Sequence, residues 1–144
     1  TLAVGAYGEA SGVVGDLNDD TMMNAGAAYV FTRTGGLWEQ RAYLKAGQPG
    51  FADSFGFAVA LSDEGNTLAV SAPLEDSGVD GDPLDNSAEA AGAVYVFARV
   101  ADEWSPQAYI KAAHPDPWDV FGVSIALSGD GDTLAVGTDS EDEG

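Results

Sequence analysis

Acidic side chains gather in two stretches of the chain that lie 66 residues apart. The first reads Asp16-Leu17-Asn18-Asp19-Asp20, so that oxygen-bearing side chains stand at positions i, i+2 and i+4. Calcium takes about six to eight hard oxygen ligands, and a turning loop can bring alternate side chains onto one ion. The pattern predicts calcium as a cofactor, and its candidate ligands are Asp16, Asn18, Asp19, Asp20, Asp80, Asp82, Asp85 and Asn86.

The same residues also have a simpler interpretation. Aspartate and asparagine side chains hydrogen-bond to the backbone two residues further on, which favours turns without any ion. No complete calcium loop of the EF-hand type, with its glutamate at the twelfth position, is present. A solvated acidic loop and a calcium site therefore both stay open at this point.

Trp118 is the candidate ligand-binding residue. It follows Pro117 in a predicted loop, and the position 66 residues earlier holds Ala52. An exposed aromatic residue in a loop is a common anchor for a binding partner. The alternative is that Trp118 is a hydrophobic plug.

Residues suited to catalysis are few. The chain has no cysteine, and its one histidine, His114, aligns with Gln48 in the preceding copy. No pairing of a nucleophile with a base recurs, and no glycine-rich phosphate loop is present. We therefore expect that the protein is not an enzyme.

The charge of the chain limits its partners. Its 144 residues include 24 acidic and 5 basic side chains, a formal net charge of −19. Such a charge repels nucleic acid and anionic membrane surfaces, and it favours cations or a basic partner. No apolar run of about 18 residues exists, so we expect no membrane insertion.

These residues are carried by an internal repeat. Residues 1–4 (TLAV) return at 67–70 and again at 133–136, an offset of 66 each time. Of the first 66 positions, 32 are identical in the second copy without any insertion. Both copies must therefore fold alike, and a repeat of this kind buries its faces against its neighbours.

Each copy contains four runs typical of β-strands, which in the complete copy are residues 55–62, 67–72, 93–98 and 105–112. The first three are apolar on both faces, which predicts strands that are buried on both sides. The fourth alternates, with a proline near its start and Lys111 on its wetter side. That pattern is typical of an edge strand.

A four-stranded antiparallel unit repeated in tandem describes a β-propeller blade, so the predicted fold class is all-β. The alternative is a β-solenoid or open stack. We expect a partial blade at 1–54, a complete blade at 55–120 and a partial blade at 121–144. The chain would then be part of a longer protein, or a protomer that completes its blades with strands from other copies.

Several short motifs resemble those of the FG-GAP repeat family, which includes the integrin α-chain propeller. Phe55-Gly56 and Phe121-Gly122 match the FG element, Ser71-Ala72-Pro73 resembles the GAP element, and residues 92–97 (GAVYVF) resemble the third strand. The spelling is similar to repeats of secreted bacterial and archaeal proteins. The resemblance implies an extracellular propeller used for adhesion or ligand binding, frequently with bound calcium.

The chain departs from the family at its usual metal site. Integrin-type repeats hold calcium in an Asp-rich loop between the first and second strands, but residues 62–66 and 128–132 are too short for that loop. Any calcium would therefore bind between the second and third strands.

Two functions are expected from this sequence. One is a binding or adhesion module, extracellular or on the cell surface, whose partner is a protein or a glycan. The other is a structural subunit that binds further copies of itself and forms a surface fibre or layer by strand exchange.

Overall fold

The computed structural model describes residues 1–13, 16, 18–78 and 82–140, which form strands and no helix. The strands, in chain order, are β1 (Leu2–Ala6), β2 (Ala27–Thr34), β3 (Leu37–Leu44), β4 (Val59–Leu61), β5 (Thr67–Ala72), β6 (Ala93–Val100), β7 (Glu103–Ile110), β8 (Ser124–Leu127) and β9 (Leu134–Gly137).

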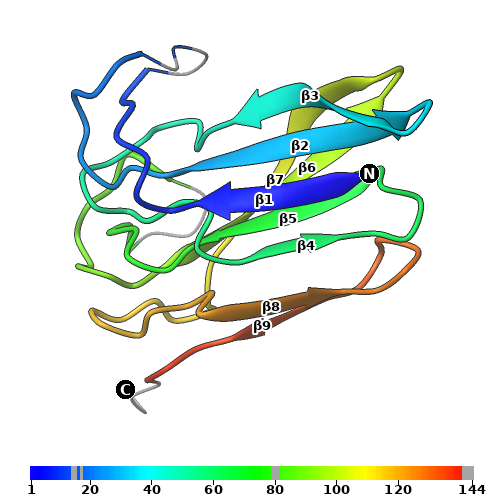
Figure 1. The fold of residues 1–144 in the computed structure, drawn as a ribbon. Coiled ribbons are helices and arrows are strands. Elements are labelled where there is room, and N and C mark those ends of the chain that lie inside the picture. Colours follow the sequence, from blue (N-terminus) through cyan, green and yellow to red (C-terminus); the bar gives the residue numbers. More distant parts are fainter. Residues whose placement is uncertain (14–15, 17, 79–81, 141–144) are drawn as a thin grey trace.

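All strand pairs within the sheets are antiparallel, and they form three sheets. The first sheet has the order β1-β2-β3, the second β4-β5-β6-β7 and the third β8-β9. Figure 1 shows the second sheet between the other two, with all three stacked face to face. The all-β fold of partial propeller blades is thereby confirmed, and the sheets do not close into a ring.

The second sheet is buried on both faces, as the two-sided apolar strands predicted. Leu68 and Val70 of β5 pack toward the first sheet, where they contact a cluster that includes Val30 and Leu44. Ala69, the residue between them, joins a second cluster with residues of the third sheet. Alternate side chains of β5 therefore pack against the two neighbouring sheets.

Phe55 differs from its prediction. Residues 55–62 were expected to form a strand, but β4 covers only Val59–Leu61. Ser54 and Gly56 have φ values of 60° and 88°, which take the chain out of an extended conformation on both sides of Phe55. The Phe55 ring is fully buried and packs edge-on against Tyr95 at 5.3 Å between centroids.

The fourth strand is an edge strand, as predicted, but it spans Glu103–Ile110 rather than 105–112. Pro106 lies opposite Phe97, where the register shifts by a bulge. A proline has no N–H to donate, so it is tolerated at an edge.

The backbone follows the 66-residue period even where the side chains differ. Gly26 and Gly92 have φ values of 82° and 83°, and an added Cβ would lie 1.9 and 2.3 Å from the carbonyl oxygens of Phe55 and Phe121. Non-glycine residues with positive φ also pair at this offset, namely Asn24 with Ala90, Ala52 with Trp118, and Ser54 with Val120.

Candidate functional site

The predicted site residues that the structure describes lie on loops that gather at one end of the sheets (Figure 1). We call this the loop end. It comprises the first loop (7–26), the second loop (73–92), the first connection (45–58) and the second connection (111–123).

Aspartates hold the first loop in shape. Asp19 Oδ2 accepts hydrogen bonds from the Gly12 amide at 2.7 Å and the Thr21 hydroxyl at 2.8 Å. The bond from Thr21 is the main reason that the pKa of Asp19 lies below its usual value. Asp16 Oδ1 accepts from the Asn18 amide at 2.9 Å, which is an Asx-turn.

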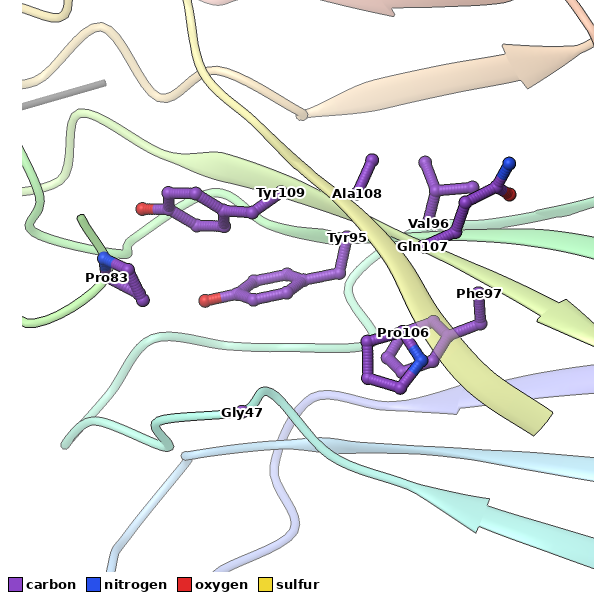
Figure 2. A pocket seen from close by; sticks show the side chains of 9 residues that line it. All are labelled: Gly47, Pro83, Tyr95, Val96, Phe97, Pro106, Gln107, Ala108 and Tyr109. Atoms are coloured by element: carbon purple, nitrogen blue, oxygen red, sulfur yellow. The ribbon is translucent and has the colours of Figure 1, made fainter. Parts of the chain in front are cut away.

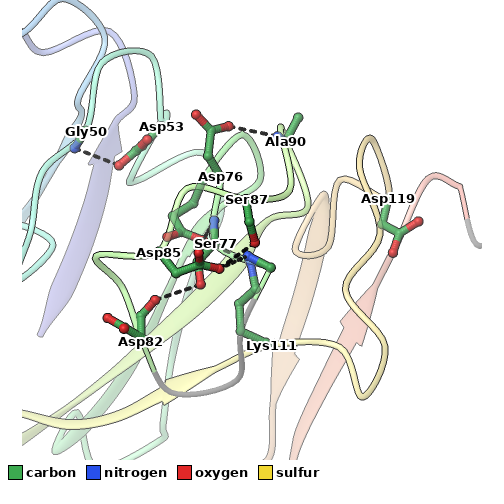
Figure 3. A network of polar contacts seen from close by, with 12 residues as sticks. Gly50, Asp53, Asp76, Ser77, Asp82, Asp85, Ser87, Ala90, Lys111 and Asp119 are labelled. Carbon is green, nitrogen blue, oxygen red and sulfur yellow. Dashed lines mark hydrogen bonds and ion pairs between the residues drawn. The ribbon is translucent and has the colours of Figure 1, made fainter.

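The second loop repeats this arrangement at the equivalent positions (Figure 3). Asp85 Oδ2 accepts from the Gly78 amide at 3.0 Å and the Ser87 hydroxyl at 2.6 Å. Asp82 Oδ1 accepts from the Leu84 amide at 2.9 Å. Of the predicted ligands in this loop, Asp80 lies outside the described residues.

These contacts bear on the predicted calcium ligands. Within residues 1–13, 16, 18–78 and 82–140, no three acidic or histidine side chains converge on a point where an ion could lie. Four of the predicted aspartates accept hydrogen bonds within their own loop, and Asn18, Asp20 and Asn86 are exposed. The described side chains therefore fit a turn-forming role better than a calcium site, and calcium binding stays a prediction.

A buried ion pair anchors the second loop to the sheet beneath it. Lys111 Nζ lies 2.9 Å from Glu75 Oε2, and the two side chains are 0% and 4% exposed. The prediction that Lys111 faces the wetter side of its strand is wrong. β7 ends at Ile110, and the second loop passes over the lysine and supplies Glu75. The same carboxylate oxygen accepts from the Ser77 amide at 3.2 Å.

Asp53 is a second buried carboxylate at the loop end, and sequence reasoning did not single it out. Its side chain accepts a hydrogen bond from the Gly50 amide at 2.7 Å, and the residue is 5% exposed. Burial raises the pKa of Asp53 to about 7, and the nearby carboxylates of Glu75 and Asp76 add to the effect.

Two tyrosines of the second sheet line an apolar pocket of about 280 Å³ (Figure 2). The rings of Tyr95 and Tyr109 lie 5.1 Å apart, and Pro83 lies near their hydroxyl groups. Both hydroxyls are buried without a hydrogen bond of normal geometry, although Tyr109 lies beside Glu75. Burial raises the pKa of both tyrosines, so they remain protonated.

Trp118 stands on the solvent side of the loop end. It is 56% exposed, and it lines a hollow of about 250 Å³ with Phe51, which is 66% exposed. Leu74 and the carboxylate-bearing residues Asp76 and Glu89 line the same hollow. Two aromatic rings and two carboxylates together suit a partner with cationic or mixed apolar and cationic chemistry.

Sequence reasoning found only part of this hollow. Trp118 was predicted as a binding residue, but Phe51 and Glu89 were not. The position equivalent to Phe51 is Pro117, so the repeat does not mark Phe51 as an aromatic position. The hollow joins two connections and the second loop, so no spacing along the chain could indicate it.

Comparison with known proteins adds one match. The sequence pattern of a family described as FG-GAP repeat matches residues 38–97, which run from β3 of the first sheet to β6 of the second. No curated protein matches the chain. Within the described part of the chain, no helix is long and apolar enough to span a bilayer.

Proposed function

Since the chain belongs to the FG-GAP repeat family, whose repeats are generally non-catalytic binding modules, we propose that it is an extracellular binding or adhesion module. Its loop end contacts a protein or glycan partner, and Trp118 is the anchor of that contact. The observation that carries the proposal is that the Trp118 side chain is exposed. Its repeat equivalent, Ala52, adopts the same left-handed backbone conformation with a much smaller side chain.

The repeat supplies an internal control for Trp118. The φ value of Trp118 is 72° and that of Ala52 is 67°, so the same left-handed backbone forms with either residue. A bulky residue in this region is strained by roughly 1–3 kcal/mol, and such strain gathers at binding sites. The fold therefore does not require a tryptophan here, and the exposed ring is available to a partner.

The chemistry of the hollow favours a basic partner surface. Asp76 and Glu89 border the two exposed rings, and the chain carries a net charge of −19. The long-range field and the local carboxylates thus attract the same class of partner. The aromatic rings add apolar contact and cation–π attraction at short range.

The experiment that tests this function compares two exposed tryptophans. Trp38 is 52% exposed and lies on β3, outside the loop end. The wild-type protein, Trp118→Ala and Trp38→Ala are applied to an array of immobilised glycans and extracellular proteins. We expect Trp118→Ala to lose the array signal while Trp38→Ala keeps it. Equal signals from all three proteins would reject the loop end as the contact surface.

Calcium is a separate part of the proposal. It rests on the spacing of oxygen ligands in the two acidic loops, where the Asx-turns of Asp16 and Asp82 each use Oδ1 and the carboxylate carries a second oxygen, Oδ2. A calcium titration followed by melting temperature tests it, with magnesium as the control ion. An unchanged melting temperature at millimolar calcium would remove calcium from the proposal.

A second candidate function is self-assembly, which the outer face of the first sheet favours. Leu2 and Val4 are 45% and 42% exposed, whereas their repeat equivalents Leu68 and Val70 are fully buried against the first sheet. A blade from a second copy would bury these side chains in the same way. Light scattering at increasing concentration tests this candidate, and a constant monomeric mass would exclude it.

A further inference from the structure

The lysines and the arginines of this acidic chain lie in different parts of the structure. Its five cationic side chains are two lysines and three arginines, and both lysines are buried in ion pairs. The arginines, Arg33, Arg41 and Arg99, all lie on the hairpins β2–β3 and β6–β7. Figure 1 shows the turns of these hairpins at the end of the sheets opposite the loop end.

Two of the arginines line one hollow between the first and second sheets. This hairpin hollow has a volume of about 300 Å³, and it is bordered by Thr32, Thr34 and Arg41 on one side and Arg99, Asp102 and Trp104 on the other. Neither hairpin forms it alone. The hollow is distinct in position and charge from the one at Trp118.

Arg99 is held in place before any ligand arrives. Its Nε and Nη2 atoms donate to Asn66 Oδ1 at 3.2 and 2.9 Å, and its guanidinium lies 5.9 Å from the centre of the Trp104 ring. Its Nη1 atom has Asp102 at 3.9 Å, and that side chain is 96% exposed. Such an exposed ion pair is weak, so an incoming anion can replace Asp102 at little cost.

The other side of the hollow also offers donors. Arg41 Nε donates to Thr32 Oγ1 at 3.0 Å, and its Nη2 atom pairs with Glu39 at 2.5 Å, which leaves Nη1 for a ligand. On the Arg99 side, Trp104 Nε1 is buried without a hydrogen-bond partner. A guanidinium binds carboxylates through parallel N–H groups, so two arginines in one hollow suit a carboxylate.

We propose that the hairpin hollow binds an acidic sugar residue, whose carboxylate pairs with Arg99 and Arg41. The threonine hydroxyls and the carboxylate of Asp102 supply hydrogen-bond partners for the sugar hydroxyls. The volume is at the lower end of the usual range for ligand pockets, which suits a single ring. This inference goes beyond the proposed function, because it assigns a second site with its own ligand.

The indole N–H signals of the three tryptophans test this site by NMR, because Trp104, Trp38 and Trp118 report on different surfaces. The probes are glucuronate, glucose and acetate at about 0.15 M salt, where remote carboxylates are screened beyond about 8 Å. We expect glucuronate to shift the Trp104 signal saturably without a matching shift of Trp118. Glucose and acetate should bind about tenfold more weakly, since each lacks half of the contacts.

Variants separate a specific site from general charge effects. Arg99→Gln and Arg41→Gln should each weaken glucuronate binding about tenfold. Arg33→Gln is the control and should not weaken it, because Arg33 lies on the same hairpin as Arg41 but outside the hollow. Retained signal dispersion shows that each variant is folded, and Thr34→Val, at an exposed position, is a milder second variant that should also weaken binding. Equal losses in Arg33→Gln and Arg99→Gln, or acetate binding as strong as glucuronate binding, would overturn the proposal. The array test of Trp118 concerns the loop end and not the hairpin hollow, so either proposal can fail without the other.

Discussion

Lys111 and Glu75 form an ion pair of 2.9 Å across 36 residues of sequence, and both side chains are almost completely buried. The equivalent pair in the preceding copy, Lys45 and Glu9, spans the same separation at 2.8 Å, with Glu9 15% exposed. Each pair fastens the loop between the second and third strands to the end of the fourth strand. The loops that carry the predicted site residues are therefore held by charge pairs inside the blades.

Lys111→Met should destabilise the protein by about 3–5 kcal/mol, because it leaves the Glu75 carboxylate buried without a counter-charge. The measurement is urea unfolding. Lys45→Met is the matched control and should cost less, since water reaches Glu9 more easily than Glu75. The double variant Lys111→Met/Glu75→Leu should recover most of the loss, because it removes both charges. A double variant less stable than Lys111→Met would contradict this account.

Asp53 should make stability depend on pH. Its pKa is about 7 in the folded protein against an ordinary value of 3.8, so the folded state binds more protons between these values. The contribution of Asp53 to stability is therefore present below about pH 4 and is lost as the pH rises to about 7. Asp53→Asn should remove this loss, so that it gains roughly 4 kcal/mol relative to wild type as the pH rises from 4 to 7.

Urea unfolding at several pH values measures the Asp53 effect. The Asp20→Asn variant, at an exposed position, is the control for removing one surface carboxylate. A wild-type curve parallel to that of Asp53→Asn would show that Asp53 is ionised in the folded protein.

Phe55 packs between the first and second sheets, and its truncation should lower the stability of the protein. The ring is fully buried and meets Phe97 edge-on at 6.1 Å as well as Tyr95. Phe55→Ala should cost about 3–5 kcal/mol by leaving a cavity between the first and second sheets. Phe51→Ala, at a position that is 66% exposed, should change stability by less than about 0.5 kcal/mol. Similar losses in both variants would mean that Phe55 does not fill this core.

The repeat predicted the strand order because a fixed offset forces equivalent residues into equivalent strands. β5 begins and ends where its apolar run does, at Thr67 and Ala72. β4 is shorter than its apolar run because the positive φ values of Ser54 and Gly56 interrupt the extended chain beside Phe55, and an apolar run does not indicate such values. Alternation along one strand also could not show that a distant loop covers Lys111.

The two hollows were beyond the reach of sequence reasoning for a related reason. Each is lined by two or more segments of the chain, and apart from Ala52 and Trp118 the residues that meet there are not at equivalent repeat positions. Phe51 meets Trp118, and Arg41 of the first sheet meets Arg99 of the second. Only the stacking of the blades brings such residues together.

Trp118 should contribute little to stability, which separates its role from that of a hydrophobic plug. Because Ala52 adopts nearly the same φ, Trp118→Ala should change the unfolding free energy by less than about 1 kcal/mol. Trp118→Gly should be at least as stable as Trp118→Ala, since glycine enters the left-handed region without strain. Thermal unfolding of the three proteins measures this, and circular dichroism shows whether the sheets are retained. A loss of about 3 kcal/mol or more in Trp118→Ala would instead identify the ring as part of the core, and the binding defect of that variant would then follow from unfolding.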